Sequence, residues 1–399
     1  MKDIILVKDK TKCAGCQMCA NICPRDAIVM QEDACGFVYP EIITDRCVQC
    51  GLCVETCDYT KEAGVEKRMP LKTYAVASTD KKILETSSSG GVFSALVKYT
   101  KDRNGAVCGC ILDEGLYPRH VCTEDEKVME RMRGSKYVQS DMGQVYRQVR
   151  ERVREGKFTL FTGTPCQVAA LYAFLGKREI PELLTVDLIC HGVPSARMFH
   201  KFIAYLEKKH QTNIVDFKFR SKRYGWQRFT SEFIDDKGKV KNIGKVNEFY
   251  HTAFSTGNIM RPNCFSCQYA QQARVGDITL GDLWGREKMQ VSFNTSRGVS
   301  FCALNTKKAQ QVFAEIAGDV LADEVPYALV VKANHCLRAP TPKGTKWEAY
   351  MQAIKDDRIE KMALAYIKSH KKTIIRNKLK LRVPQSIFDF VRKCKYGVK

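Results

Sequence analysis

Eight cysteines near the start of the chain fall into two runs with identical spacing. Cys13, Cys16, Cys19 and Cys23 follow the pattern C-x2-C-x2-C-x3-C, and Cys47, Cys50, Cys53 and Cys57 repeat it 34 residues later. The two-residue gaps place successive sulfurs on one side of a tight loop, and the three-residue gap begins a turn away from it. Pro24, directly after the first run, keeps that loop from closing back. A repeat of this kind indicates an internal duplication.

This spacing is the one with which bacterial ferredoxins bind two [4Fe–4S] clusters, where three thiolates hold one cluster and the fourth ligates the other. We therefore expect one cluster on Cys13, Cys16, Cys19 and Cys57, and a second on Cys47, Cys50, Cys53 and Cys23. Zinc typically uses isolated C-x2-C pairs and four ligands in total. A disulfide framework suits a small secreted chain rather than one of 399 residues. Asp58 stands where the first run has Pro24, so the rigidity of the second loop is open.

The rest of the sequence is typical of a globular protein with two or three domains. It contains no run of 18 apolar residues, so we expect no transmembrane helix. The first ten residues have only four apolar residues in a row and no cleavage-like site, so we do not expect a signal peptide. Nineteen cysteines without an export signal are typical of a reducing compartment, and we expect a cytoplasmic protein.

The formal net charge is +21, and the excess is concentrated at the C-terminal end. Residues 1–70 contain nine Lys/Arg and eleven Asp/Glu, whereas residues 361–399 contain twelve Lys/Arg and one acid. We interpret this tail as a solvated basic helical face. The alternative is a weak contact with the inner membrane face, suggested by an apolar patch at Ile387, Phe388, Phe390 and Val391. No segment resembles a base-reading module, so we expect no nucleic-acid partner.

After a short linker at Met69 and Pro70, strand and helix patterns alternate. The expected strands cover 74–77, 106–112, 158–162 and 183–190, the expected helices cover 90–100, 143–154, 167–175 and 195–208, and antiparallel strands cover 215–219 and 229–234. This order predicts an α/β domain with a mixed sheet. We thus expect an α+β ferredoxin-like module over 1–65, an α/β domain over 70–340 and a helical basic tail over 341–399.

Glycine-rich turns and four further cysteines lie where expected strands end or expected helices begin. SSSGGVFSAL, residues 87–96, opens a helix, and free N–H groups at a helix start attract anions. Many ordinary helix caps are serine-rich as well. GTPCQ, residues 163–167, follows an apolar strand, and α/β sheets bind ligands at the carboxyl ends of strands. The spacing leaves open whether four thiols from three loops meet or stay apart, namely Cys166, Cys190, Cys264 and Cys267.

Six motifs occur in a fixed order: SSSGGVFSAL, RGSKYVQS, GTPCQVAAL, DLICHGVPS, CFSCQYA and GDITLGDLWG. In combination they resemble the coenzyme F420 hydrogenase/dehydrogenase beta subunit family, in which an N-terminal ferredoxin module is common. The resemblance implies a FAD-binding α/β domain with its own [4Fe–4S] cluster beside the flavin. Archaeal members exchange electrons with a deazaflavin coenzyme, plant and cyanobacterial members include a 7-hydroxymethyl chlorophyll a reductase, and bacterial stand-alone members often accompany polysaccharide genes. The chain looks most like the bacterial group.

The resemblance also implies which residues form the site. It makes Cys166, Cys190, Cys264 and Cys267 the ligands of a third cluster. The flavin contacts that it implies are Ser88, Ser89, Gly90, Gly91, Ser135, Lys136, Tyr137, Gly163 and Thr164. Lys136 would offset the charge of a pyrophosphate or a reduced flavin. An ordinary surface lysine is the alternative for that residue.

His191 and Tyr137 are the candidate catalytic residues. His191 directly follows a cysteine of the third set, and an imidazole titrates near neutral pH, which suits delivery of a proton. A structural hydrogen bond near a cluster sulfur is an equally good interpretation of His191.

FRSKRYGW, residues 219–226, places basic and aromatic side chains together. Arg220, Lys222 and Trp226 would line a pocket for an acidic or sugar-like substrate, and a solvated basic hairpin is the alternative. Asp277 and Asp282 are interpreted as structural or close to the flavin. The remaining cysteines are interpreted as buried structural residues: Cys35, Cys108, Cys110, Cys122, Cys302, Cys336 and Cys394.

Together these features predict an iron–sulfur flavoprotein oxidoreductase, an enzyme that passes electrons between ferredoxin-type clusters and FAD and reduces or oxidises an organic substrate, in polysaccharide or cell-surface metabolism. A soluble carrier such as ferredoxin is the expected electron partner. The alternative is an electron-transfer subunit of a larger hydrogenase/dehydrogenase complex that uses a deazaflavin coenzyme. A redox sensor with labile clusters is a third hypothesis. Substrate, direction and oligomeric state stay open.

Overall fold

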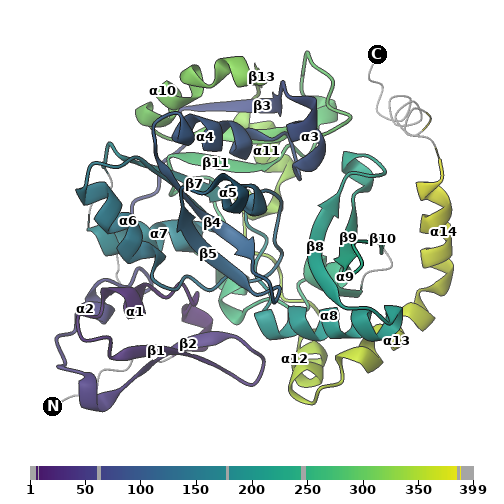
Figure 1. Cartoon of the computed structure of the whole chain (residues 1–399), viewed down its shortest axis with the longest axis horizontal. Helices are drawn as coiled ribbons and strands as arrows, with labels where there is room; N and C mark the ends of the chain where they lie inside the picture. Colours follow the sequence, from purple (N-terminus) through teal and green to yellow (C-terminus); the bar gives the residue numbers. More distant parts are fainter. Residues whose placement is uncertain are drawn as a thin grey trace.

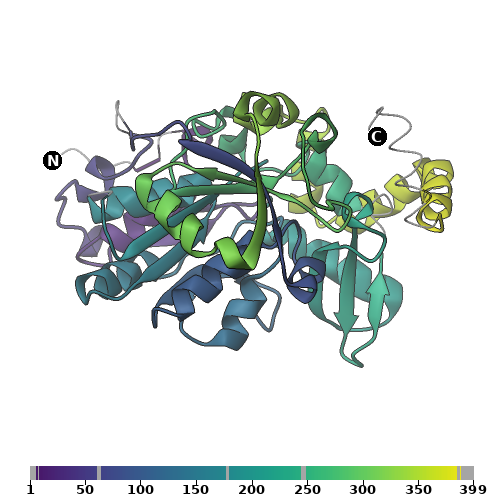
Figure 2. The ribbon, with the colours of Figure 1, turned by 90° about the horizontal axis from the view of Figure 1, so that it is seen from above.

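The computed structural model describes residues 6–7, 9–60, 64–176, 179–243, 249–383 and 387. A ferredoxin-like module, purple in Figure 1, lies against an α/β domain built on an eight-stranded sheet. A three-stranded sheet stands beside the large one. The last helix, α14 (Lys371–Leu381), yellow in Figures 1 and 2, lies on the side of the molecule away from the module. The expected module followed by an α/β domain with a mixed sheet is confirmed.

Short helices that begin inside the cysteine runs, together with one hairpin, form the module. Its elements are η1 (Lys10–Lys12), α1 (Met18–Ile22), β1 (Ile28–Glu32), β2 (Val38–Ile42), η2 (Thr44–Arg46) and α2 (Leu52–Glu55). Left-handed backbone occurs at Gly15 and Gln17 in the first run, and at Gln49 and Gly51 in the second. These are corresponding positions, so the duplication extends from the cysteine spacing to the turns of the backbone.

The large sheet has the strand order β13-β3-β12-β11-β7-β6-β4-β5. In chain order its strands are β3 (Lys72–Ser78), β4 (Ala106–Leu112), β5 (Pro118–Thr123), β6 (Thr159–Gly163), β7 (Leu183–Leu188), β11 (Ile278–Asp282), β12 (Ser300–Leu304) and β13 (Val320–Glu324). The central strands β4, β6, β7 and β11 are parallel, and the strands that flank them are antiparallel. The four strands expected from the sequence before residue 195 are confirmed as β3, β4, β6 and β7. The carboxyl ends of β6 and β7 meet at one edge of the sheet.

Helices cover both faces of this sheet, as Figure 2 shows. They are α3 (Lys81–Thr86), α4 (Val92–Lys101), α5 (Glu126–Met132), α6 (Val145–Arg154), α7 (Pro165–Leu175), α10 (Lys307–Glu315) and α11 (Tyr327–Ala333). Successive residues of a strand point to opposite faces. On β6, Leu160 packs in the cluster with α4, α5 and α10, and Phe161 packs in the cluster with α6 and α7. Both faces of β6 are therefore covered by helices, as is typical of a parallel strand inside a sheet.

The smaller sheet has the order β10-β9-β8 and is antiparallel, as expected. Its elements and neighbours are α8 (Ala196–His210), β8 (Ile214–Ser221), η3 (Trp226–Arg228), β9 (Thr230–Asp235), β10 (Val240–Asn242) and α9 (Phe249–Ser255). Its core is aromatic, with the rings of Phe202 and Tyr250 stacked at 5.2 Å between centroids. Phe37 and Tyr39, from the hairpin of the module, belong to the same core. The module therefore shares buried surface with the domain.

The C-terminal region is helical, with α12 (Trp347–Lys355), α13 (Ile359–Ser369) and α14 (Lys371–Leu381). Ile354 on α12 and Ala363 on α13 are buried in the aromatic core. Ile375 and Leu379 on α14 are half-exposed. Ile387 is exposed, and the rest of the expected apolar patch, Phe388, Phe390 and Val391, lies outside the described residues. In the ranges that the structure covers, no helix has the length and hydrophobicity needed to cross a membrane.

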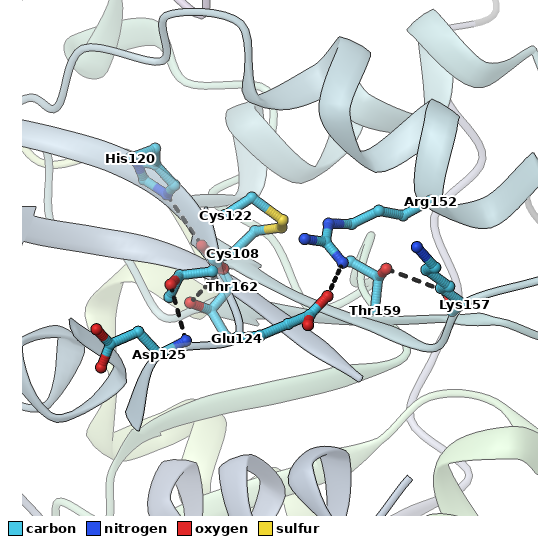
Figure 3. The surroundings of a disulfide bond; sticks show 10 residues. Cys108, His120, Cys122, Glu124, Asp125, Arg152, Lys157, Thr159 and Thr162 are labelled. Atoms are coloured by element: carbon cyan, nitrogen blue, oxygen red, sulfur yellow. Dashed lines mark hydrogen bonds and ion pairs between the residues drawn. A yellow bond between two sulfur atoms is a disulfide. The ribbon is translucent and has the colours of Figure 1, made fainter. Parts of the chain in front are cut away.

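One interpretation of the unassigned cysteines is wrong. The register of β4 and β5 puts Cys108 opposite Cys122, and a disulfide joins the two sulfurs (Figure 3). They are therefore a pair rather than two free cysteines. Sequence reasoning missed the pairing because β5 was not expected, and only the hairpin brings the two residues together. Cys35, Cys302 and Cys336 are buried free cysteines, as expected, and Cys110 is partly buried. Cys394 lies outside the described residues.

Candidate functional site

The first set of cysteines assigned from the spacing lies together in the structure. Burial raises the pKa of Cys19 to about 12, and the neighbouring thiols of Cys13 and Cys57 contribute to this rise. The pKa of Cys16 is also raised, first by burial and then by Cys19, Cys57 and Cys13. Four thiols that act on one another in a buried place are suited to a cationic centre, because metal binding favours the thiolates that burial disfavours.

The second set lines one interior space. Cys23, Cys47, Cys50 and Cys53 face it, together with Val48 and Leu52. Cys50 and Val48 are exposed at its rim. In the described part of the chain, no three His, Cys, Asp or Glu side chains come close enough to hold a single metal ion. A set of four neighbouring thiols suits a [4Fe–4S] cluster, in which each thiolate binds a separate iron.

The four cysteines from the α/β domain also meet. Cys166 lies in the first turn of α7, Cys190 follows β7, and Cys264 and Cys267 lie in and after the 3-10 helix η4 (Pro262–Ser266). Burial raises the pKa of Cys190 well above its usual value, and Cys264, Cys166 and Cys267 raise it further. The parallel strands β6 and β7 end at the same edge of the sheet, which brings the first two together. The four thiols therefore lie near enough to one another to interact electrostatically.

Two tyrosines, the buried Tyr146 and the partly buried Tyr59, lie between the first and third sets of cysteines. The Tyr146 hydroxyl donates to the Cys16 carbonyl at 3.0 Å. The pKa of Tyr59 is raised by burial first and then by groups that include Cys166 and Cys16. The two sets are therefore neighbours across an aromatic contact.

Asp58, at the position where the first run has a proline, anchors the second run instead. Its carboxylate accepts from Gln268 Nε2 at 3.0 Å and from the Tyr269 hydroxyl, both next to Cys267. It also accepts from the backbone N–H of Val65. The rigidity that proline would give comes here from hydrogen bonds to the α/β domain.

The serine- and glycine-rich turn packs tightly on the large sheet. Ser88 Oγ accepts from the Ser135 N–H at 2.8 Å, which joins the two segments expected at the flavin. The Gly90 N–H donates to Ser300 Oγ at 2.8 Å. A Cβ on Gly90 would lie 2.0 Å from the Val76 carbonyl oxygen, so only glycine fits there. Gly91, at φ +90, is the N-cap of α4.

Lys136 is not an ordinary surface lysine. Its ammonium donates to the carbonyls of Arg131 and Met132, at 2.7 and 2.9 Å, and to that of Arg133 at 3.3 Å. Burial lowers its pKa to about 8. In this conformation the charge closes the C-terminal turn of α5, where a cation is favoured by the helix dipole.

Tyr137 joins the candidate flavin region to the candidate catalytic histidine. Its ring stacks on Phe254 at 4.6 Å, and His191 packs edge-on against Phe254 at 5.2 Å. His191 Nδ1 lies 3.1 Å from Thr341 Oγ1, and its Nε2 lies 3.3 Å from the Ser255 carbonyl oxygen. Burial lowers the pKa of His191. Its nearest hydrogen-bond partners are thus a hydroxyl and a carbonyl.

The three basic and aromatic residues proposed for a substrate pocket are buried. Arg220 forms an ion pair with Asp282, and Lys222 donates to the Leu84 carbonyl at 2.6 Å and to the Ser89 carbonyl. Trp226 is fully buried. The alternative of a solvated basic hairpin is therefore wrong. Arg220 also interacts with the Tyr137 hydroxyl, whereas Oδ1 of Asp282 and Nε1 of Trp226 have no hydrogen-bond partner among the described residues. Buried polar groups without a partner point to a polar ligand at this place.

Thr164 connects the strand end to the third set of cysteines. With Gln167 it forms a capping box at the start of α7, and its hydroxyl lies 3.1 Å from Cys166 Sγ. Gln167 donates to Ser140 Oγ at 2.9 Å, and this hydroxyl lies 2.7 Å from His120 Nδ1. Gly163 is the last residue of β6.

Two segments of the chain match known families. Residues 157–328 match the model for the C-terminal part of the coenzyme F420 hydrogenase/dehydrogenase beta subunit, and residues 12–60 match the 4Fe-4S dicluster domain. The resemblance drawn from the motifs is confirmed. Residues 157–328 are thus similar to the C-terminal part of that beta subunit, and we call this part of the chain the beta-subunit domain; a segment similar to a dicluster domain precedes it. The chain is related to iron–sulfur electron-transfer oxidoreductases.

Among solved structures, the chain is similar to a chain of the F420-reducing [NiFe] hydrogenase complex from Methanosarcina barkeri, from a structure of its xenon derivative. The two chains are 18% identical with a TM-score of 0.44, and the match covers 77% of this chain and 94% of that one. No curated protein matches the chain.

Several residues of the beta-subunit domain and its contacts were not expected from the sequence. They are Tyr59, His120, Gln139, Asp187, Arg261 and Arg274. Gln139 and Asp187 lie inside the motifs RGSKYVQS and DLICHGVPS, which were used only for their neighbours, and the other four lie outside the quoted motifs. Their roles depend on burial and on partners far along the chain, which no local pattern signals.

Proposed function

We propose that the protein is an iron–sulfur flavoenzyme that takes single electrons from a soluble carrier and delivers them to an organic substrate. The observation that carries the proposal is the convergence of Cys166, Cys190, Cys264 and Cys267 beside the module. These thiols would hold a third [4Fe–4S] cluster, with Thr164 as a hydrogen-bonding neighbour of Cys166. When bound, such clusters transfer one electron each and a flavin exchanges two with an organic molecule.

The residues that would hold FAD lie in the region around Ser88, Ser135 and Tyr137. The buried polar atoms without a partner among the described residues, Oδ1 of Asp282 and Nε1 of Trp226, support a polar ligand there. Because these side chains are buried, we assign Arg220, Lys222 and Trp226 to the cofactor rather than to a bulky substrate. Tyr137 and His191 would orient the substrate or move a proton through the aromatic contact with Phe254.

The rim of the second cysteine set is the proposed entry for electrons. Cys50 is exposed, and the apolar side chains of Val48 and Leu52 surround it. The charge of residues 1–70 is close to balanced, in contrast to the strongly basic tail. A soluble donor such as ferredoxin would therefore meet little repulsion here.

Analysis of anaerobically purified protein tests the proposal. We expect about twelve irons per chain, roughly four for each set of cysteines, together with FAD. The variant Cys166→Ser should lose about a third of the iron and keep the spectroscopic signals of the module. Cys110→Ser, which changes a partly buried cysteine outside the three sets, is the control and should keep all of it. A wild-type iron content near eight would rule out the third cluster, and release of FMN or of no flavin would rule out FAD.

A second candidate is an electron-transfer subunit of a larger complex. It is favoured by exposed apolar side chains on α13 and α14, namely Leu364, Ile375 and Leu379. A subunit should copurify with stoichiometric partners, whereas an enzyme should oxidise or reduce a substrate alone with an electron donor.

A further inference from the structure

Arg261 is fully buried between the first and third sets of cysteines. Its Nε donates to the Cys13 carbonyl at 2.7 Å and its Nη2 to the Val38 carbonyl at 2.9 Å. The same Nη2 lies 3.8 Å from Cys13 Sγ. Nη1 donates to Gln139 Oε1 at 3.0 Å. One side chain of the beta-subunit domain thus binds the cysteine loop and the hairpin of the module.

The partners of this guanidinium are neutral oxygens and a thiol. The two comparable buried arginines differ in this respect, since Arg274 lies 3.0 Å from Asp187 and Arg220 pairs with Asp282. In the described ranges of the chain, no carboxylate pairs with Arg261. Burying a charge without a counter-charge is strongly unfavourable. The counter-charge therefore has to come from the thiolates around it.

The charge acts on both sets of cysteines. On the side of the third set, the Arg261 carbonyl accepts from the N–H of Cys264 at 3.0 Å. The guanidinium contacts the first set directly, because it donates to the Cys13 carbonyl and lies 3.8 Å from Cys13 Sγ. Arg261 is also the residue directly before η4, the 3-10 helix that contains Cys264. The guanidinium is consequently within electrostatic range of both places.

The residues around Arg261 fix the position of its guanidinium. The guanidinium lies over the Tyr39 ring at 4.3 Å. Gly15, at φ +64, approaches so closely that a Cβ there would lie 2.7 Å from Nη1 of Arg261. The Gln139 amide, which accepts from Arg261, also donates to the carbonyls of Ala14 and Gly15. A side chain held on all sides presents a fixed charge.

We propose that Arg261 is the shared counter-ion of the first and third clusters and raises the reduction potentials of both. The part that concerns the third cluster rests on the proposed function, whereas the part that concerns the first does not. Reduction adds one electron, taken from a one-electron donor, to a centre that is already negative with its four thiolates. A fixed cation nearby favours the more negative form, so its loss lowers the potential. Arg261 is thus a positioning residue that acts through the clusters.

The experiment is a redox titration of the full chain, followed by EPR with reduced viologen dyes as the electron source. For one unit charge a few ångströms away in a partly polarisable interior, we expect a change of at least about tenfold in the one-electron reduction equilibrium. Arg261→Met should therefore lower the midpoint potentials of the first and third clusters by about 59 mV or more. Arg261→Lys keeps the charge and should stay close to wild type.

Arg147→Met is the matched control. Arg147 also binds the module, donating to the carbonyls of Asn21 and Cys23, but its charge is paired with Asp26 at 2.8 Å. This variant should weaken the same interface without shifting the two potentials. If Arg261→Met loses iron, Arg261→Gln, which keeps donors without the charge, takes its place in the comparison with Arg261→Lys.

Equal midpoint potentials in Arg261→Lys and in the uncharged variant, at full iron content, would overturn the proposal. An equal shift in Arg147→Met would also overturn it, because the effect would then come from the interface. An iron content of about eight per wild-type chain would refute only the part of the proposal that concerns the third cluster. The potential of the first cluster would still test Arg261 in that case.

Discussion

The buried ion pair of Asp187 and Arg274 offers a sharp test of how the third set of cysteines is held in place. Asp187 is fully buried at the end of β7 and lies 3.0 Å from Arg274 Nη2. It also accepts from the backbone N–H groups of Val275 and Gly276, both at 3.0 Å. The pair thus ties the strand that leads to Cys190 to the segment that follows Cys267.

Asp187→Asn keeps the shape of the side chain but removes its charge. Breaking a buried pair on one side costs about 3–5 kcal/mol. The amide oxygen can still accept from the backbone, and Arg274 keeps its bond to the Leu188 carbonyl at 3.0 Å, so we expect the lower end, about 3 kcal/mol. For a domain of this size, that corresponds to a fall in melting temperature of about 5 °C.

Thermal unfolding under anaerobic conditions, followed by circular dichroism, measures the fall in melting temperature. Lys72→Met is the control, because the exposed pair of Lys72 and Glu324 should contribute about 0–1 kcal/mol. The double variant Asp187→Leu with Arg274→Met removes both charges and should recover part of the stability. If Asp187→Asn has the same melting temperature as the wild type, the ion pair does not stabilise the segment around the third set of cysteines, and the reasoning fails.

Three further predictions follow from individual sites. Burial lowers the pKa of His120 to about 4 in the folded protein, whereas the pKa of an unfolded histidine is near 6.5. The unfolded chain therefore binds this proton more readily, so the contribution of His120 to the folding stability is complete above about pH 6.5 and is lost as the pH falls toward about 4. Lowering the pH from about 7.5 to about 5.5 should thus destabilise the wild type by about 1 kcal/mol more than His120→Gln, and equal pH dependence in urea titrations would contradict this. Val48→Asp at the rim of the second set should slow electron uptake from reduced ferredoxin in stopped-flow measurements, whereas Leu321→Asp, a similarly exposed change on β13, should not; equal rates would exclude the proposed entry. Gly90→Ala should lower the flavin content, because its Cβ would meet the Val76 carbonyl, and unchanged flavin on mass analysis of the released ligand would count against the role of this turn.

The local sequence determined the parts of the protein whose geometry is local. The two cysteine runs assign each thiol to its set, because two- and three-residue gaps fix which sulfurs face one loop, and the structure brings the assigned sets together. Strand β4 was predictable because it is buried on both faces and is an apolar run, and β6 and β7 were predictable from the buried apolar pairs inside them. β5 and β13 were missed because they are edge strands with polar residues, for which pairing rather than composition decides.

The tertiary structure decided what depends on distant partners. Cys166, Cys190, Cys264 and Cys267 meet because parallel strands end at one edge and η4 returns to it, which no spacing between them encodes. The disulfide of Cys108 and Cys122 likewise depends on a hairpin that local pattern did not signal. A charged residue in the sequence is by default an exposed one, because burial of a charge is costly. Only the fold shows that Arg261 is buried against a cysteine loop about 250 residues away, and that physical cost is what gives the residue its proposed role.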